Sequence, residues 1–158
     1  MMDQKEWRTM DKSKWGPGLW QDEPDKVQWI DEATDLDCLV VRNGGGALCG
    51  YVGVPPGHPL HGMDYDAVDD KTNIRVHGGL TFSDACQEHA EEGRGVCHVP
   101  EPGRPADVWW LGFDCAHHGD LSPKWDSEYA MFGGFYKDLG WVRSEVARLA
   151  RQVAAVTT

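Results

Sequence analysis

The sequence predicts an α+β fold in which a mainly antiparallel sheet is accompanied by one short helix and a long C-terminal amphipathic helix packed on it. Three patterns carry this prediction: a glycine-rich turn between two apolar runs, an unbroken apolar run at residues 108–113, and a helical stripe near the C-terminus. With 158 residues, 41% of them hydrophobic, the chain is long enough to bury a core as one domain.

The first 35 residues differ from the rest because they are polar and turn-rich, yet hold four of the eight tryptophans, namely Trp7, Trp15, Trp20 and Trp29. Tryptophan is large and usually finds a partner for its N–H group. We therefore expect residues 1–35 to form an arm packed on a single α+β domain at residues 36–158. A short strand is expected at residues 27–30.

The clearest hairpin joins apolar runs at residues 36–42 and 47–54 through an Asn-Gly-Gly-Gly segment. Glycine supplies the positive φ that tight hairpin turns need. Two registers are open. A two-residue Asn-Gly turn sets Cys38 opposite Cys49, whereas a turn centred on the first two glycines sets Cys49 opposite Val40.

Between the hairpin and residue 108 the chain is expected to alternate loops with short elements. Ser83 is a favourable N-cap for a helix that Gly93 ends. The expected order is loop at 55–62, acidic loop at 64–73, strand at 74–77 continuing at 80–82, helix at 83–92, and strand at 96–99.

The two remaining elements are the strongest predictions. Residues 108–113 are apolar without alternation, which predicts a strand buried on both faces. Apolar residues then recur at spacings of three and four, which predicts an amphipathic helix. The residues of that stripe are Leu139, Val142, Val146, Leu149 and Val153.

The formal net charge is −11, from 26 acidic and 15 basic residues. Such a charge disfavours nonspecific nucleic-acid binding and anionic membranes, because both need an excess of Lys and Arg. No stretch approaches the ~20 apolar residues of a membrane span, and residues 1–6 lack the apolar centre of a signal peptide. We expect a cytoplasmic protein whose five cysteines are reduced thiols.

The main candidate site follows the predicted strand at 108–113. Asp114, His117 and Asp120 stand just beyond its end, and His77 ends another predicted strand next to two glycines. If the strands are neighbours, these four side chains line a ligand pocket. His77, Asp114 and His117 could hold a divalent metal ion, or a histidine could act as a general base oriented by a carboxylate.

Three further residues near these segments are weaker candidates. His58 lies in a stiff, proline-flanked loop and could form a pocket wall. His118 is a secondary candidate for the main site. Cys115 is predicted to be a packed thiol, not a nucleophile, because proximity to a histidine in sequence does not establish catalytic geometry.

A second cluster consists of Cys86 and His89, three residues apart on the predicted helix, followed by Cys97. Their side chains match the ligands of a structural zinc site, although paired Cys-x-x-Cys motifs are missing. Buried, reduced thiols are the favoured interpretation, and a Cys86–Cys97 disulfide is the least favoured one in a reducing compartment.

Five segments resemble a family of hypothetical proteins from bacteriophages and prophages, and they cover nearly the whole chain. This resemblance implies an accessory role in a phage or mobile element and transfers no catalytic residues. The segments are Met10-Asp11-Lys12-Ser13, Trp20 to Trp29, Cys49 to Val54 with Gly57-His58-Pro59, His77 to Phe82, and Gly112 to His117.

Three functions follow as hypotheses. The first is a phage-associated accessory protein whose His/Asp-lined pocket binds a small molecule or nucleotide, with assistance from a metal. The second is an acidic inhibitor that binds a host defence protein, using an exposed face such as Asp64, Asp66, Asp69 and Asp70. The third is a virion or assembly component, for which the sequence offers no coiled coil or repeat.

Overall fold

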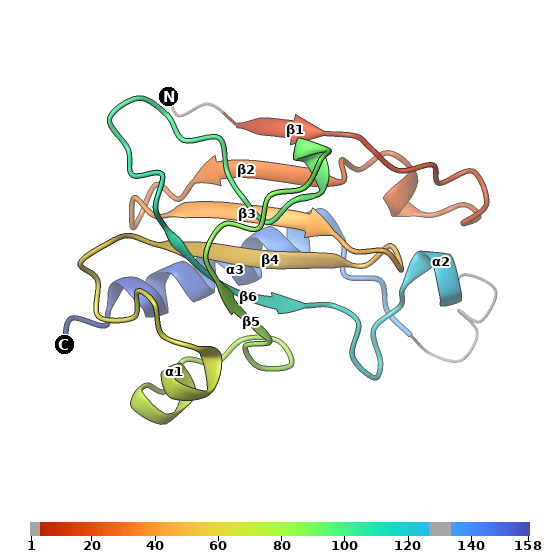
Figure 1. Ribbon diagram of the computed structural model, residues 1–158. Coiled ribbons are helices and arrows are strands. Elements are labelled where there is room, and N and C mark those ends of the chain that lie inside the picture. Colours follow the sequence, from red (N-terminus) through yellow and green to blue (C-terminus); the bar gives the residue numbers. More distant parts are fainter. Residues whose placement is uncertain (1–3, 127–133) are drawn as a thin grey trace.

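The computed structural model describes residues 4–126 and 134–158, and this part of the chain confirms the α+β class. Six strands form an antiparallel sheet in the order β1-β2-β3-β4-β6-β5, and α3 lies along one face of it (Figure 1). The strands are β1 Lys5–Trp7, β2 Lys26–Ile30, β3 Asp37–Arg42, β4 Leu48–Val54, β5 Phe82–Asp84 and β6 Trp109–Asp114. The helices are α1 Tyr65–Lys71, α2 Pro123–Asp126 and α3 Leu139–Ala154, with short 3₁₀ turns η1 Leu19–Gln21 and η2 Glu92–Arg94.

The N-terminal arm is part of the sheet, because it supplies β1 and β2, and β2 pairs with β3 along its whole length. Its irregular part is fixed by a buried ion-pair network. Asp25 Oδ1 lies 2.8 Å from Lys12 Nζ and 2.9 Å from Arg42 Nε, and all three side chains are almost fully buried. Trp15 and Trp20 bury their rings in a small apolar cluster beside this network.

The β3–β4 hairpin has neither of the two expected registers. Cys38 lies opposite Val52 and Cys49 opposite Val41. The turn is longer because the Asn43 side chain accepts hydrogen bonds from the amides of Gly45 and Ala47, which stabilises a five-residue loop. The cysteines are therefore not opposed, and both remain free and buried.

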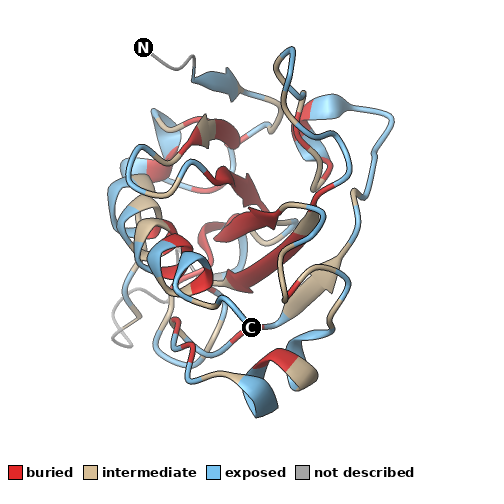
Figure 2. Cartoon of the chain, turned by 90° about the vertical axis from the view of Figure 1, so that its left-hand side faces the viewer, coloured by how far each residue is buried: buried red, intermediate tan, exposed pale blue. Residues whose placement is uncertain are grey.

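The two central strands are buried on both faces, as Figure 2 shows for the red strands seen beside α3. One face packs on α3, whose buried residues are Ala150 and four of the five residues of the predicted stripe, whereas Leu139 is only partly buried. Gly50 allows this close packing, because a Cβ there would lie 2.6 Å from both Phe113 and Val146. The other face is covered by loops that contribute Val108 and Val96 to a second cluster with Trp110.

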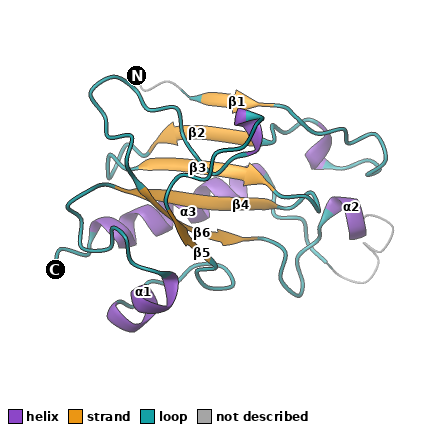
Figure 3. Ribbon diagram, in the orientation of Figure 1, coloured by secondary structure: helices purple, strands orange, loops and turns teal. Residues whose placement is uncertain are grey.

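The middle of the chain departs from prediction (Figure 3). The acidic segment expected as a loop forms α1, capped by Asp64, whose side chain accepts from the Ala67 amide. Residues 74–77 form no strand. The helix expected at 83–92 is absent: Ser83 pairs with Leu111 in β5, and its hydroxyl accepts from the Tyr65 amide at the start of α1.

Beyond β5 the chain is irregular, and only Val96 of the strand expected at 96–99 forms an isolated bridge, to Gln87. This bridge sets Cys86 beside Cys97, with their Cα atoms 4.7 Å apart, and the two form a disulfide. The prediction of reduced thiols is therefore wrong for this pair. No helix among the described residues is long and apolar enough to cross a membrane.

Candidate functional site

The main candidate residues meet where β6 leaves the sheet. The chain turns back after Asp114, with the Asp120 amide bonded to the His117 carbonyl, and Asp120 is bridged to Phe135 ahead of α3. His77 arrives from the turn before β5, in which the Gly79 amide donates to the Val76 carbonyl. The site therefore combines three segments that are far apart in sequence.

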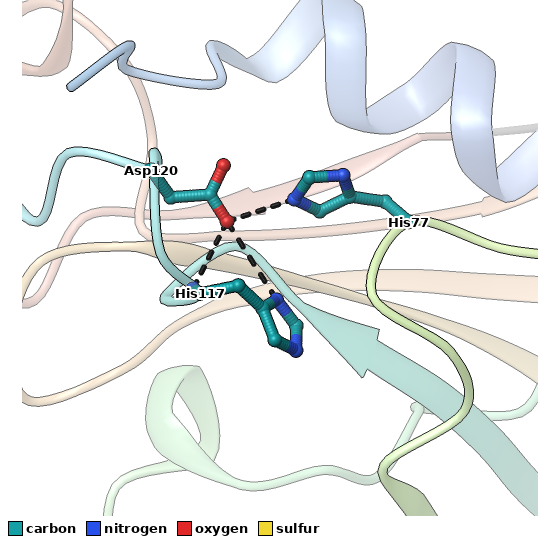
Figure 4. Close-up of side chains that lie close together, drawn as sticks. All are labelled: His77, His117 and Asp120. Atoms are coloured by element: carbon teal, nitrogen blue, oxygen red, sulfur yellow. Dashed lines mark hydrogen bonds and ion pairs between the residues drawn. The ribbon is translucent and has the colours of Figure 1, made fainter. Parts of the chain in front are cut away.

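Asp120 is the centre of a cluster that consists of His77, Asp114, His117 and Asp120. Figure 4 shows Asp120 with the two histidines. Asp120 Oδ2 lies 2.8 Å from His77 Nε2, 3.0 Å from the His117 amide nitrogen and 3.6 Å from His117 Nδ1. Its Oδ1 lies 3.1 Å from Lys137 Nζ. The Asp120 side chain is only 1% exposed, whereas those of His77 and His117 are 24% and 31% exposed.

The environment of Asp120 keeps its carboxylate ionised. Burial alone opposes ionisation, but the hydrogen bonds from His77, from the His117 amide and from Lys137 outweigh it. These contacts hold the pKa of Asp120 below its usual value. The buried carboxylate is therefore a permanent negative charge between two imidazole rings.

His117 is positioned by the glycine that follows His77. Gly78 has a φ of +69°, and a Cβ at this position would lie 2.3–2.6 Å from three atoms of the His117 ring. The ring thus occupies the space that a side chain would fill. Its Nδ1 is buried and forms no hydrogen bond with any described residue, although it faces Asp114 Oδ1 at 3.3 Å and Asp120 Oδ2.

Asp114 and Glu145 add further negative charge around the histidines. The carboxylate of Asp114 accepts hydrogen bonds from the Ala116 amide and from the Thr81 hydroxyl. Glu145 on α3 accepts from the His77 amide at 2.7 Å, which fixes the backbone of His77. Hydrogen bonds from Arg148 hold the pKa of Glu145 below its usual value, and so this group is also ionised.

Exposed aromatic side chains form a rim beside the cluster. The Trp141 ring lies edge-on to His77 at 5.0 Å, and Lys137 Nζ lies 5.5 Å from the Trp141 ring and 5.8 Å from that of Phe135. Phe135 is 72% exposed. A surface hollow of about 530 Å³ runs along α3 from here and is lined in part by Trp141 and Glu145.

The weaker candidates lie outside this cluster or are enclosed. His58 Nε2 contacts the Val153 carbonyl at 2.9 Å and Nδ1 accepts from the Leu60 amide, so both ring nitrogens are engaged in packing the loop on α3. Val153 is about 18 Å along the helix axis from Trp141, so His58 does not reach the cluster. His118 is exposed. Burial raises the pKa of the Cys115 thiol, consistent with the prediction of a packed thiol.

The second predicted cluster is not assembled as a zinc site. Cys86 and Cys97 are bonded to each other, and His89 Nδ1 accepts from the Glu91 amide. A carboxylate oxygen of Glu88, not a nitrogen of His89, lies within 4.8 Å of both sulfur atoms. The helix that was to align Cys86 with His89 does not exist, which explains why the expected triad fails.

Four residues of the site were missed at the sequence level: Phe135, Lys137, Trp141 and Glu145. Trp141 and Glu145 lie off the apolar stripe of α3, which is a pattern typical of any solvated helix face. Phe135 and Lys137 precede the helix in a segment without a motif. Their roles depend on how α3 crosses the sheet, and no local pattern encodes that crossing.

Fold and site together define the class of this protein. It is an α+β protein with a six-stranded antiparallel sheet and a His/Asp cluster at one end of β6. Comparison of the chain with protein-family models, with curated proteins and with solved structures gives no match. The resemblance to phage proteins therefore stays a prediction, and the functional argument depends on the geometry alone.

Proposed function

We propose that this protein binds a divalent transition-metal ion through His77 Nε2, His117 Nδ1 and Asp120 Oδ2, and that the ion helps it to bind a small molecule. The observation that carries the proposal is the buried Nδ1 of His117, which makes no hydrogen bond with any described residue and faces the carboxylates of Asp114 and Asp120 at 3.3 and 3.6 Å. A buried polar atom without a hydrogen bond is costly, by about 1–3 kcal/mol. A metal ion at this point would bind Nδ1 and lie beside both carboxylates.

The spacing of the three donor atoms supports this assignment. They all lie within 4.8 Å of one another, and the two distances from Asp120 Oδ2 are 2.8 Å to His77 Nε2 and 3.6 Å to His117 Nδ1. Zinc–nitrogen bonds of about 2.0–2.1 Å in a tetrahedron place ligand atoms roughly 3.4 Å apart. Shifts of less than about 1 Å would therefore admit the ion.

The surrounding charges also favour a cation. Asp114, Asp120 and Glu145 contribute three carboxylates, and Lys137 contacts only the oxygen of Asp120 that faces away from the histidines. Lys137 does not contact Oδ2, the oxygen that lies near both imidazole rings, so Oδ2 can bind a metal ion. Imidazole and carboxylate donors suit zinc and similar ions better than magnesium or calcium.

Three protein ligands leave a coordination position open for an oxygen atom of a ligand or for water. The Trp141 ring lies edge-on to His77, and the Lys137 ammonium group, which contacts Asp120 Oδ1, lies 5.5 Å from the Trp141 ring and 5.8 Å from the exposed ring of Phe135. A metal ion, a cation and aromatic surfaces fit a small molecule that has an anionic or carbonyl oxygen near a flat apolar part. This is the ligand class we assign to the site.

Zinc titration of chelator-treated protein by calorimetry tests the proposal, with elemental analysis of the purified protein as a second readout. We expect one ion per chain, and His117→Ala and His77→Ala should each weaken binding by more than about tenfold. His118→Ala is the matched control, because it removes an adjacent, exposed imidazole. Unchanged zinc affinity in His117→Ala, or absence of 1:1 binding, contradicts the proposal.

The host-protein inhibitor stays as a second candidate, favoured by one observation. The four aspartates expected on an acidic face are all exposed and belong to α1 or its cap. A pull-down from host lysate at low and physiological salt tests it, with a variant in which Asp66, Asp69 and Asp70 are replaced by Asn as the control. Recovery of the same proteins by both baits contradicts this candidate.

A further inference from the structure

A second hollow shares no residue with the His/Asp cluster and lies at the same end of the sheet, where the β3–β4 turn is found. It has a volume of about 540 Å³ and is bounded by the N-terminal arm, the β3–β4 turn, η2 and α2. Figure 1 shows the arm, the turn and α2 gathered at this end of the molecule. Hollows of 300–1,000 Å³ are typical of small-molecule sites.

The hollow is positively charged, although the protein carries a net charge of −11. Lys14, Arg94 and Lys124 line it against a single carboxylate, Asp11. Lys14 and Lys124 form no ion pair with any residue in the described ranges. Arg94 is held by Glu91 at 3.1 Å and by the Thr9 carbonyl at 3.2 Å, so its guanidinium group is fixed at the edge.

Two tryptophans supply aromatic surface in the same hollow. Trp125 is 62% exposed, and its indole lies over Gly45, where a Cβ would be 2.5 Å from Nε1. Lys124 Nζ lies 4.7 Å from the centre of that ring. Trp15 is only 6% exposed and packs against Gly46, so it forms a rigid wall. The exposed indole of Trp125 offers a stacking surface, and Lys14 and Lys124, which form no ion pair with a described residue, offer phosphate ligands beside it.

We infer that this hollow binds a free nucleotide. The base stacks on Trp125, and the phosphate groups contact Lys14, Lys124 and Arg94. Stacking on an aromatic side chain and cation–phosphate contacts are the two interactions that nucleotides use most. A nucleic-acid strand is disfavoured because the overall charge of −11 repels a long polyanion, whereas a mononucleotide meets only the local field.

Calorimetric titration with adenosine diphosphate at low salt tests the inference, with EDTA present so that the proposed metal site does not contribute. We expect Trp125→Ala to weaken binding about tenfold. The double variant Lys14→Ala/Lys124→Ala should weaken it about tenfold as well, and should flatten its dependence on salt. Adenosine, which lacks the phosphates, should bind at least about tenfold more weakly than the diphosphate.

Lys71→Ala is the matched control, because Lys71 is an exposed lysine at the end of α1. It should bind adenosine diphosphate like the wild type. The inference is overturned if adenosine diphosphate does not bind at millimolar concentration, or if both the tryptophan and the double lysine variants bind it unchanged. Tighter binding of oligothymidylate than of the diphosphate also overturns it, in favour of a single-strand site.

Discussion

Comparing Gly78→Ala with Gly79→Ala tests whether Gly78 positions His117, because both variants strain the same turn but only Gly78→Ala reaches the His117 ring. Gly78 and its neighbour Gly79 both have positive φ, +69° and +83°. An L-residue in this region costs about 1–2 kcal/mol at either position. The two glycines differ in space: a Cβ at Gly78 meets the His117 ring at 2.3 Å, whereas a Cβ at Gly79 has no atom within 4 Å.

The consequence for His117 follows from the contact distance. Real Cβ contacts are essentially never shorter than 3.0 Å, so the imidazole ring must move by roughly 0.7 Å or more in Gly78→Ala. Binding sites tolerate displacements of only about 0.5 Å. We therefore expect Gly78→Ala to lower zinc affinity by more than about tenfold, and to destabilise the fold by about 1–3 kcal/mol more than Gly79→Ala.

Urea denaturation of the metal-free proteins measures the difference in stability, and zinc calorimetry measures the difference in affinity. The His117 ring is partly exposed and can swing outward, which would bring the difference in stability toward the lower limit but would still remove Nδ1 from the site. Equal zinc affinities in Gly78→Ala and Gly79→Ala would refute the reasoning, since only one of them displaces the ring.

Three further results are expected. Asp25→Asn should lower the free energy of unfolding by about 3–5 kcal/mol, because it leaves buried Lys12 without its counter-ion and buried Arg42 with Glu23 alone, and urea denaturation at neutral pH measures it. Burial opposes ionisation of Asp25, but hydrogen bonds from Lys12 and two backbone amides lower its pKa below 3.8, so its stabilising effect is present above pH 3.8 and lost as the pH falls further. Denaturation between pH 5 and pH 2 should therefore show a larger loss of stability in the wild type than in Asp25→Asn, which keeps the losses from Asp120 and Glu145. Gly50→Ala should lower the free energy of unfolding by about 1–3 kcal/mol, because a Cβ there overpacks the contact between the sheet and α3. Gly44→Ala, with no atom within 4 Å of its Cβ, should match the wild type, and the melting temperatures of the two variants measure the difference.

Long, regular patterns were enough to predict the main elements. The apolar run at 108–113 became β6 within one residue, and four of the five residues in the stripe from Leu139 to Val153 are buried on α3, Leu139 being partly buried. Both patterns reflect burial along a whole element, so neighbouring contacts cannot easily override them. The hairpin strands were also predicted, but their register was not, because the Asn43 side chain adds bonds that lengthen the turn.

The short elements were decided by their partners. Ser83 has the chemistry of a helix cap, yet β6 offers a free edge to the residues around it, and strand pairing replaces the expected helix. The same change removed the predicted zinc triad, since Cys86 and His89 no longer share a helix face. It also brought Cys86 to Cys97, which a compositional argument about reducing compartments had disfavoured.

The sequence by itself determined which residues could form a site: His77, Asp114, His117 and Asp120 were selected because polar groups follow apolar strands. Only the tertiary structure decided how they meet. His77 comes from a turn and not from a strand, and Asp120, not Asp114, is the carboxylate shared by both histidines. The physical reason is that donor distances depend on how β6, the glycine turn and α3 pack together, and this packing is a long-range property that no local spacing records.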